Sequence, residues 1–461
     1  MRLFLFEHPK HFSSVKNFIK TLKNIWSIEE LRSKILYTLL LLFVYRVGTF
    51  IVLPGINPAG LDAISNQTNN NGILGLINTF AGGAFSQASI FALGIMPYIS
   101  ASIFVQLMTV LVPQFQKMQK EGESGRKKIN QWTRYLTVAV TLVQASAYVA
   151  YLRQMTANTG GVLPAYVDYF WLSTVVLLTA GTMFVMWLGE KITDKGLGNG
   201  TSLIIMIGII ARLPQSFMQE LGSKSTRSGL ILVFIIEIAI LIAIIMGCIM
   251  LVQGVRKIPV NYAKQIVGNR QFGGARQFLP IKVNSAGVMP IIFAQAVLFL
   301  PTLFNLTGTA TGTGIASMFQ DHSNVGYMIV YAVVVIGFTF LYTALIFNPK
   351  QIADNLKQNN GFIPGVKPGQ PTTDYIGAIM DKVTLPGAIL LALVGILPGI
   401  AQRLGVQPTF STFFGGTSLL IMVGVILDTL QQIETQLLMR QYDGLMKSGR
   451  IQGRTVTQAS Y

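Results

Sequence analysis

The sequence predicts an all-α polytopic membrane protein, with ten transmembrane helices in two pseudo-symmetric inverted halves of five and a short re-entrant helix. Of its 461 residues, 51% are hydrophobic and only 11% are charged, whereas about a quarter of the residues in a soluble domain are charged. Many uncharged segments of about 20 residues are long enough to cross the roughly 30 Å hydrocarbon core of a bilayer. This composition excludes the soluble classes of protein.

We expect ten spans, because ten apolar segments of this kind follow one another along the chain. They lie near residues 35–53, 88–112, 133–152, 165–188, 196–213, 229–252, 286–304, 325–347, 376–400 and 414–438. Most of the 35 lysines and arginines fall in the two termini and in alternate loops. The positive-inside rule therefore places both termini in the cytoplasm. The same distribution accounts for the net charge of +17 without a nucleic-acid partner.

Five spans on each side of a polar stretch suggest a division into halves. An odd number of spans makes the second half enter the membrane from the opposite side, as in the inverted repeats of transport proteins. The stretch "QELGSKSTRSG", residues 219–229, is the expected hinge. The predicted parts are a cytoplasmic amino-terminal segment, a first half, a hinge loop, a second half and a cytoplasmic tail: 1–34, 35–218, 219–228, 229–438 and 439–461.

A segment between the first two spans is too short to cross the membrane. Its apolar part, residues 73–80, would form a helix about 12 Å long. The preceding loop has no lysine or arginine and lies on the outer side. Glycines at 72, 75, 82 and 83 allow the chain to bend in and out. Such a helix either lies on the membrane surface or enters a protein-lined cavity, and its residues leave both possibilities open.

The second span carries isoleucines at every fourth position. In "FALGIMPYISASIFVQL", residues 91–107, Ile95, Ile99 and Ile103 share one face of a helix. Core packing explains any one of them. Isoleucines also fall in the middle third of four spans, at Ile99, Ile205, Ile292 and Ile421. Together they could form an apolar collar, which resists wetting and so blocks ions.

Seven motifs occur in order between about Ile35 and about Gln436. They are "FALGIMPYISASI", "EGESGRKKINQWTRYLT", "KGLGNGTSLII", "VRKIPVNYAKQ", "LPIKVNSAGVMP", "FNPKQIADNLKQNNGFIPGVKPG" and "FGGTSLLI". This series closely resembles the bacterial SecY family, the channel subunits of the Sec protein translocase. The resemblance implies a central protein-conducting channel that passes unfolded secretory polypeptides across the membrane. It also implies a lateral gate, where spans 2 and 3 face spans 7 and 8, that releases signal sequences and transmembrane helices into lipid.

The resemblance assigns two groups of residues to the seal of the resting channel. The residues that match the pore ring are Ile95, Ile99, Ile205, Ile292 and Ile421. The residues that match the plug helix are Ile73, Leu74, Gly75, Leu76, Ile77, Asn78, Thr79 and Phe80. Aliphatic side chains have no hydrogen-bonding atoms, so such a ring could part around a polypeptide of any sequence. Pro97 and the small residues beside it would let the second span flex.

Basic residues are frequent in the loops between spans 6 and 7 and between spans 8 and 9. The candidates for partner docking are Arg256, Lys257, Lys264, Arg270, Lys350, Lys357 and Lys367. Topology and anionic lipid explain any single one, whereas the resemblance implies that these loops dock the ribosome, with contacts to rRNA, or the motor SecA. Lys367 stands where the family commonly has arginine, and so lacks its rigid fork of donors.

The resemblance implies further partners and a location. The partners are the SecE and SecG subunits, SecA, the ribosome, signal sequences, unfolded preproteins and membrane lipids. The location is the bacterial cytoplasmic membrane.

No enzymatic activity, cofactor or metal site is expected. The stretch "GLGNGTS" has no phosphate-binding lysine, and the chain has a single cysteine. The alternative function is a secondary transporter of small solutes, which would also have inverted repeats. Ionisable residues inside spans are its functional candidates, here Arg46, Glu237 and Asp428. A structural scaffold without a pore is the third class.

Overall fold

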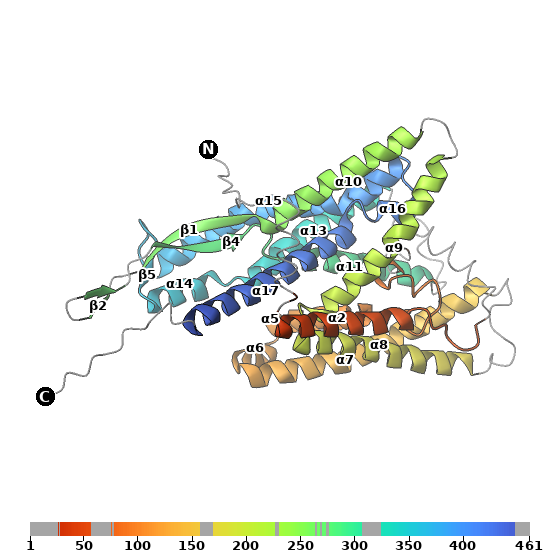
Figure 1. The fold of residues 1–461 in the computed structure, drawn as a ribbon, viewed down its shortest axis with the longest axis horizontal. Coiled ribbons are helices and arrows are strands. Elements are labelled where there is room, and N and C mark those ends of the chain that lie inside the picture. The colour runs from red at the N-terminus through yellow and green to blue at the C-terminus, as the bar shows by residue number, and fades with distance from the viewer. Residues whose placement is uncertain are drawn as a thin grey trace.

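The computed structural model describes residues 26, 28–56, 75, 78–156, 169–225, 230–262, 265–267, 270–272, 276–306 and 324–447. Helices dominate, and they form two groups with one helix running between them (Figure 1). The N-terminal group consists of α2 (Glu29–Gly48), α5 (Met96–Leu111), α6 (Pro113–Lys120), α7 (Glu123–Thr156), α8 (Phe170–Lys195) and α9 (Gly200–Ser225). The helices of the C-terminal group are α10 (Leu230–Gln253), α11 (Met289–Leu306), α13 (Val325–Ile346), α14 (Pro349–Gln358), α15 (Gln370–Arg403), α16 (Pro408–Ser411) and α17 (Gly416–Lys447).

The long helices coincide with the predicted spans. Seven of them, within the described residues, are long and apolar enough to cross a membrane: α7, α8, α9, α10, α13, α15 and α17. An eighth span is formed if α5 is counted together with α6, although the two helices meet at an angle of 98°. The remaining two predicted spans coincide with α2 and α11. The prediction of a helical polytopic membrane protein is therefore confirmed, and ten spans are consistent with these helices.

A small antiparallel sheet is the feature that the all-α prediction missed. Strand β1 (Val255–Tyr262) pairs with β4 (Arg276–Lys282) along one edge and with β5 (Gly361–Phe362) along the other. A separate hairpin pairs β2 (Gln265–Val267) with β3 (Arg270–Phe272). Strand β5 follows α14, so the sheet joins the 6/7 loop to the 8/9 loop. The pairing of β1 with β5 joins residues about 100 positions apart in the chain. The motifs of the two loops therefore do not predict it.

The predicted hinge loop is partly wrong. Residues 219–225 are the last two turns of α9, which runs to Ser225. Their polarity favours a loop, but Glu220 and Lys224 are four residues apart on one helix face, and their charged atoms are 2.8 Å apart. Such a pair stabilises a helix. Residues 226–229 of the stretch lie outside the described residues.

Three apolar cores hold the helices together. One core lies wholly within the N-terminal group, around Tyr148 and Leu178, and another lies wholly within the C-terminal group, around Tyr331 and Leu391. The third core takes side chains from both groups, including α2, α8, α9 and α17. Helix α9 packs against α8 on one side and against α10 and α17 on the other. The third core is therefore the interface between the two groups.

Candidate functional site

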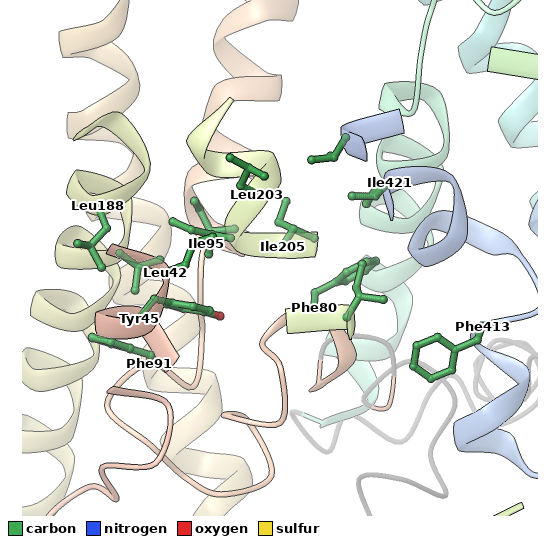
Figure 2. Packing of buried hydrophobic residues seen from close by; sticks show 14 of the residues in the cluster. Leu42, Tyr45, Phe80, Phe91, Ile95, Leu188, Leu203, Ile205, Phe413 and Ile421 are labelled. Atoms are coloured by element: carbon green, nitrogen blue, oxygen red, sulfur yellow. The ribbon is translucent and has the colours of Figure 1, made fainter. Parts of the chain in front are cut away.

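The five isoleucines of the predicted ring converge on the core between the two helix groups. Ile95, Ile205 and Ile421 are buried members of this core, and Ile99 and Ile292 are partly buried and pack against it. They come from the beginning of α5 and from α9, α11 and α17. Figure 2 shows Ile95 beside Ile205, with Ile421 on a separate helix. Residues far apart in the sequence thus form one apolar cluster.

The position of Ile99 within its span differs from the prediction. Helix α5 begins only at Met96, because the chain before it turns through Gly94 at a φ of +55°. Ile95 is the residue that caps α5, and the Ile99 backbone N–H donates to its carbonyl oxygen at 3.1 Å. Ile99 therefore lies in the first turn of α5 and not in the middle of a helix that covers the whole predicted span. Ile103 is buried elsewhere and is not a member of the cluster.

The end of the predicted plug inserts into the same core. Residues 78–80 form a helical turn, and Phe80 is 6% exposed within the cluster that holds the isoleucines. In Figure 2, Phe80 lies just below Ile205 and Ile421, and all three belong to this cluster. Thr79 donates from its hydroxyl to the Gly75 carbonyl oxygen at 2.8 Å. Of the two possibilities for the short segment, this burial favours insertion into a protein-lined cavity.

Only part of the predicted plug belongs to the described residues. Ile73, Leu74, Leu76 and Ile77 lie outside the described residues. Gly75, Asn78, Thr79 and Phe80 are described, and we call residues 78–83 the plug base. Asn78 is fully buried, and its Oδ1 atom accepts from the Ser86 backbone N–H at 3.0 Å. This bond fixes the turn that follows the plug base.

Helices α2 and α9 hold the plug base from two sides. The Arg46 guanidinium donates through Nη1 to the Gly82 carbonyl oxygen at 3.0 Å. On the other side, a Cβ atom placed on Gly208 of α9 would lie 2.8 Å from the Phe80 carbonyl oxygen. Gly82 itself has a φ of +65°, a conformation that favours glycine. The plug base is therefore seated backbone against backbone.

A cavity of mixed lining, largely apolar with several polar side chains, adjoins the plug base beside the apolar cluster. It encloses about 770 Å³, including the part that is open to solvent. Its lining includes Thr79 of the plug base, Arg212 of α9 and Gln295 of α11. The side chains of Gln295 and Thr417 hydrogen-bond across α11 and α17 at 3.0 Å. Because Gln295 follows Ile292 by one helical turn, polar side chains enter the lining within about 5 Å of the ring position.

Hydropathy and motifs do not predict that these polar residues line a cavity. The signal that could have found them is the occurrence of single polar residues, such as Gln295 and Thr417, inside strongly apolar spans.

The ionisable residues proposed for a transporter have structural partners. Arg46 binds the Gly82 carbonyl oxygen, and Glu237 is paired with Lys224. Asp428 accepts a hydrogen bond at 3.2 Å from Gln432 on the next turn of α17. In the part of the chain that the structure describes, no group of three histidine, cysteine or acidic side chains could hold a metal ion.

The basic candidates sit on one folded unit, which we call the basic unit. A small core, which includes Ile258, Ile281 and Ile376, joins the sheet to α14 and α15. On its surface the exposed candidates are Arg256, Lys257, Lys350, Lys357 and Lys367. Arg270 belongs to the β2–β3 hairpin, and Lys264 lies outside the described residues. The two basic loops are thus parts of a single surface.

Comparison with solved structures identifies the fold. The structure titled "The structure of a protein conducting channel" covers 88% of this chain and 92% of its own, with a TM-score of 0.62 at 18% identity. The structure titled "The plug domain of the SecY protein stablizes the closed state of the translocation channel and maintains a membrane seal" has a TM-score of 0.59 at 17% identity. At these identities the likeness establishes the fold alone.

Comparison with curated sequences extends over nearly the whole chain. The Protein translocase subunit SecY of Streptomyces scabiei is 41% identical over 428 residues, which are 91% of this chain and 97% of the relative. The subunit of the same name from Chlamydia trachomatis serovar D is 42% identical over 455 residues, covering 94% of this chain and 99% of the relative. The SecY family matches residues 89–430. The predicted resemblance is therefore confirmed, the transporter alternative is left without support, and the chain belongs to the SecY family.

Proposed function

We propose that this chain is the central protein-conducting channel of a Sec translocon, closed at rest by the five isoleucines and the plug base. One observation carries this proposal: the isoleucines and Phe80 share the buried core between the two helix groups. Every pathway between the groups would have to part this core. The chain then acts as a transport protein, without a catalytic centre or a resident cofactor, and a partner or the membrane potential supplies the energy.

The chemistry of the cluster suits this role. A constriction lined by aliphatic groups gives water and ions no hydrogen-bonding partner, so it stays dry when closed. The same side chains offer a translocating polypeptide no directional bonds, so they bind no particular sequence tightly. Next to the ring, the cavity around Gln295 and Arg212 offers the first polar side chains that a translocating chain would meet. The plug base adjoins both the ring and this cavity.

The opposite edges of the two groups fit the role of a lateral gate. Helix α5 of the N-terminal group and α13 of the C-terminal group are joined by a hydrogen bond from the Tyr342 hydroxyl to Gln106 Oε1 at 3.2 Å. A neutral side-chain bond of this kind contributes about 1 kcal/mol. So weak a closure could open for a signal sequence or a transmembrane helix and release it into lipid.

The binding partners that we propose follow from the family and from the exposed basic residues. Related folds occur in structures titled "Sec61 in the Canine ribosome-channel complex from the endoplasmic reticulum" and "Cryo-EM structure of idle yeast Ssh1 complex bound to the yeast 80S ribosome". By analogy, the exposed basic unit of this chain would dock the ribosome or SecA. SecE and SecG would complete the complex in the bacterial cytoplasmic membrane, with both termini in the cytoplasm.

A disulfide crosslink tests the channel. In a Cys248→Ser background, Ile99→Cys is combined with a secretory chain that carries one cysteine and is stalled halfway through export. Oxidation is expected to join the two cysteines. The matched control is Phe104→Cys on the same helix, whose side chain is 49% exposed on the outside of the protein. Equal crosslinking at 99 and 104, or none at positions 99, 292 and 421 with a confirmed stalled chain, would overturn the proposal.

A further inference from the structure

A buried ion-paired triad lies at the junction of the two helix groups, outside the apolar core. Lys224, in the last turn of α9, has its ammonium 2.8 Å from Glu220 Oε1 and also contacts Glu237 Oε1 of α10. Glu220 is fully buried, and the side chains of Lys224 and Glu237 are 9% and 8% exposed. Three charges in so dry a place are costly unless they satisfy one another. The triad is therefore more than support for the end of a helix.

The triad connects α9 and α10, and it also contacts the segment between α15 and α16. Glu220 Oε2 accepts a hydrogen bond at 3.0 Å from the backbone N–H of Gln407, in the segment between α15 and α16. Next to it, the Thr409 hydroxyl donates to Gln219 Oε1 at 3.2 Å. These contacts tie the end of the N-terminal group to a distant part of the C-terminal group. A connecting loop alone would not do so.

An aromatic layer joins the triad to the apolar core. Phe217, one turn before Glu220, has its ring centroid 5.2 Å from that of Phe234 and 6.3 Å from that of Phe410. Phe410 in turn lies 5.4 Å from Phe414, and both belong to the cluster that contains Ile421. A movement of α9 relative to Gln407 would therefore displace the layer that supports the ring.

The charges of the triad are unbalanced. Two carboxylates share one ammonium, and Glu237 Oε2 has no hydrogen-bond partner among the described residues. Lys224 is thus the group that holds the two acidic side chains together. Without it, their repulsion favours separation of α9 from α10 and exposure of both carboxylates to water.

We propose that Lys224, Glu220 and Glu237 form an ionic lock that holds the two helix groups in their closed relation, and that the lock loosens when the channel opens. This inference rests on the proposed channel function. The three residues are positioning residues, because they touch neither the ring nor the polypeptide. They act on the ring through the aromatic layer and the 407–409 segment.

The first test removes the shared cation. Lys224→Met is expected to raise ion leak through the resting channel severalfold and to allow export of a precursor with a defective signal sequence. Neutralising the two acids as well, in Glu220→Gln/Lys224→Met/Glu237→Gln, should return the leak toward the parental value, because no buried charge is left unpaired. The control is Lys382→Met, at an exposed position on α15. A leak from Lys224→Met no greater than from Lys382→Met overturns the lock.

The second test locks the same junction covalently and does not depend on how well Lys224→Met accumulates. Gln219→Cys and Thr409→Cys are combined with Cys248→Ser. Oxidation should hold the channel closed and stop export, and reduction should restore it. Equal export in the two redox states, with the 219–409 disulfide confirmed by mass spectrometry, overturns the lock. The crosslink at position 99 keeps the two proposals separate: if it forms while both lock tests fail, the channel stands and only the lock is lost.

Discussion

Gly82 of the plug base and Gly208 of α9 pack backbone against backbone. A Cβ atom placed on Gly82 would lie 2.9 Å from the Cα atom of Gly208, and one placed on Gly208 would lie 2.8 Å from the carbonyl oxygen of Phe80. Neither site has room for a methyl group unless the backbone moves. The position of the plug base against α9 therefore depends on the absence of two side chains.

Replacement of Gly208 by alanine should displace the plug base. Overpacking at such a contact costs about 1–3 kcal/mol, and each 1.4 kcal/mol shifts an equilibrium about tenfold. We expect an increase in the resting ion conductance of membranes that contain Gly208→Ala. Gly222→Ala is the control, since it lies on the same helix with no atom within 4 Å of the new methyl group. Equal conductance of the two variants would contradict the seating of the plug base.

Arg46→Ala should release the plug base from α2. The lost bond joins a charged donor to the Gly82 carbonyl oxygen, and bonds of that type contribute about 1.5–3 kcal/mol. The expected result is a higher resting leak and easier disulfide capture of the plug base by an engineered partner cysteine. Phe50→Leu is the control, because it removes only the ring that lies 5.3 Å from the guanidinium. If both variants leak alike, the bond to Gly82 is not what retains the plug base.

Ile421→Asn should weaken the seal at the ring. Ile421 is 4% exposed within the shared core, and an amide there would give water a hydrogen-bonding partner at the constriction. We expect ion leak and export of precursors with weak signal sequences to rise severalfold. Ile421→Val shortens the side chain but keeps it apolar, so its leak should stay close to the parental value. Unchanged leak and unchanged export in Ile421→Asn would exclude a sealing role.

Lys367→Glu should weaken docking on the basic unit. Lys367 is exposed in the turn between β5 and α15, and reversal of its charge opposes an anionic partner surface. Binding of ribosomes and of SecA to purified channel should fall, and the ribosome effect should shrink at high salt because phosphate contacts are screened. Lys127→Glu is the control, a reversal of equal size at an exposed lysine of α7. Normal binding of both partners to Lys367→Glu would refute a docking role.

Hydropathy was sufficient to predict the class of protein, and the order of the motifs was sufficient to predict its family. A membrane helix satisfies its own backbone hydrogen bonds, so long apolar segments report spans without knowledge of their neighbours. Helices α10 and α13 lie within a few residues of their predicted spans. The same local reasoning was wrong where tertiary contacts prevailed. Residues 88–95 of the predicted second span are not helical. Residues 219–225 continue α9, where Lys224 contacts Glu237 of α10 and Glu220 accepts a bond from Gln407.

The sequence by itself determined that this is a helical membrane protein, because partition into lipid depends on the residues of each segment alone. It also determined the family, because the family's motifs occur in order along the chain. Only the tertiary structure decided which isoleucines share a core. It brought together Ile205 and Ile421 but placed Ile103 elsewhere. It also decided that Gly208 leaves room for the plug base and that Glu220 bonds Gln407. These contacts join residues far apart in the chain, and they depend on how whole helices pack against one another.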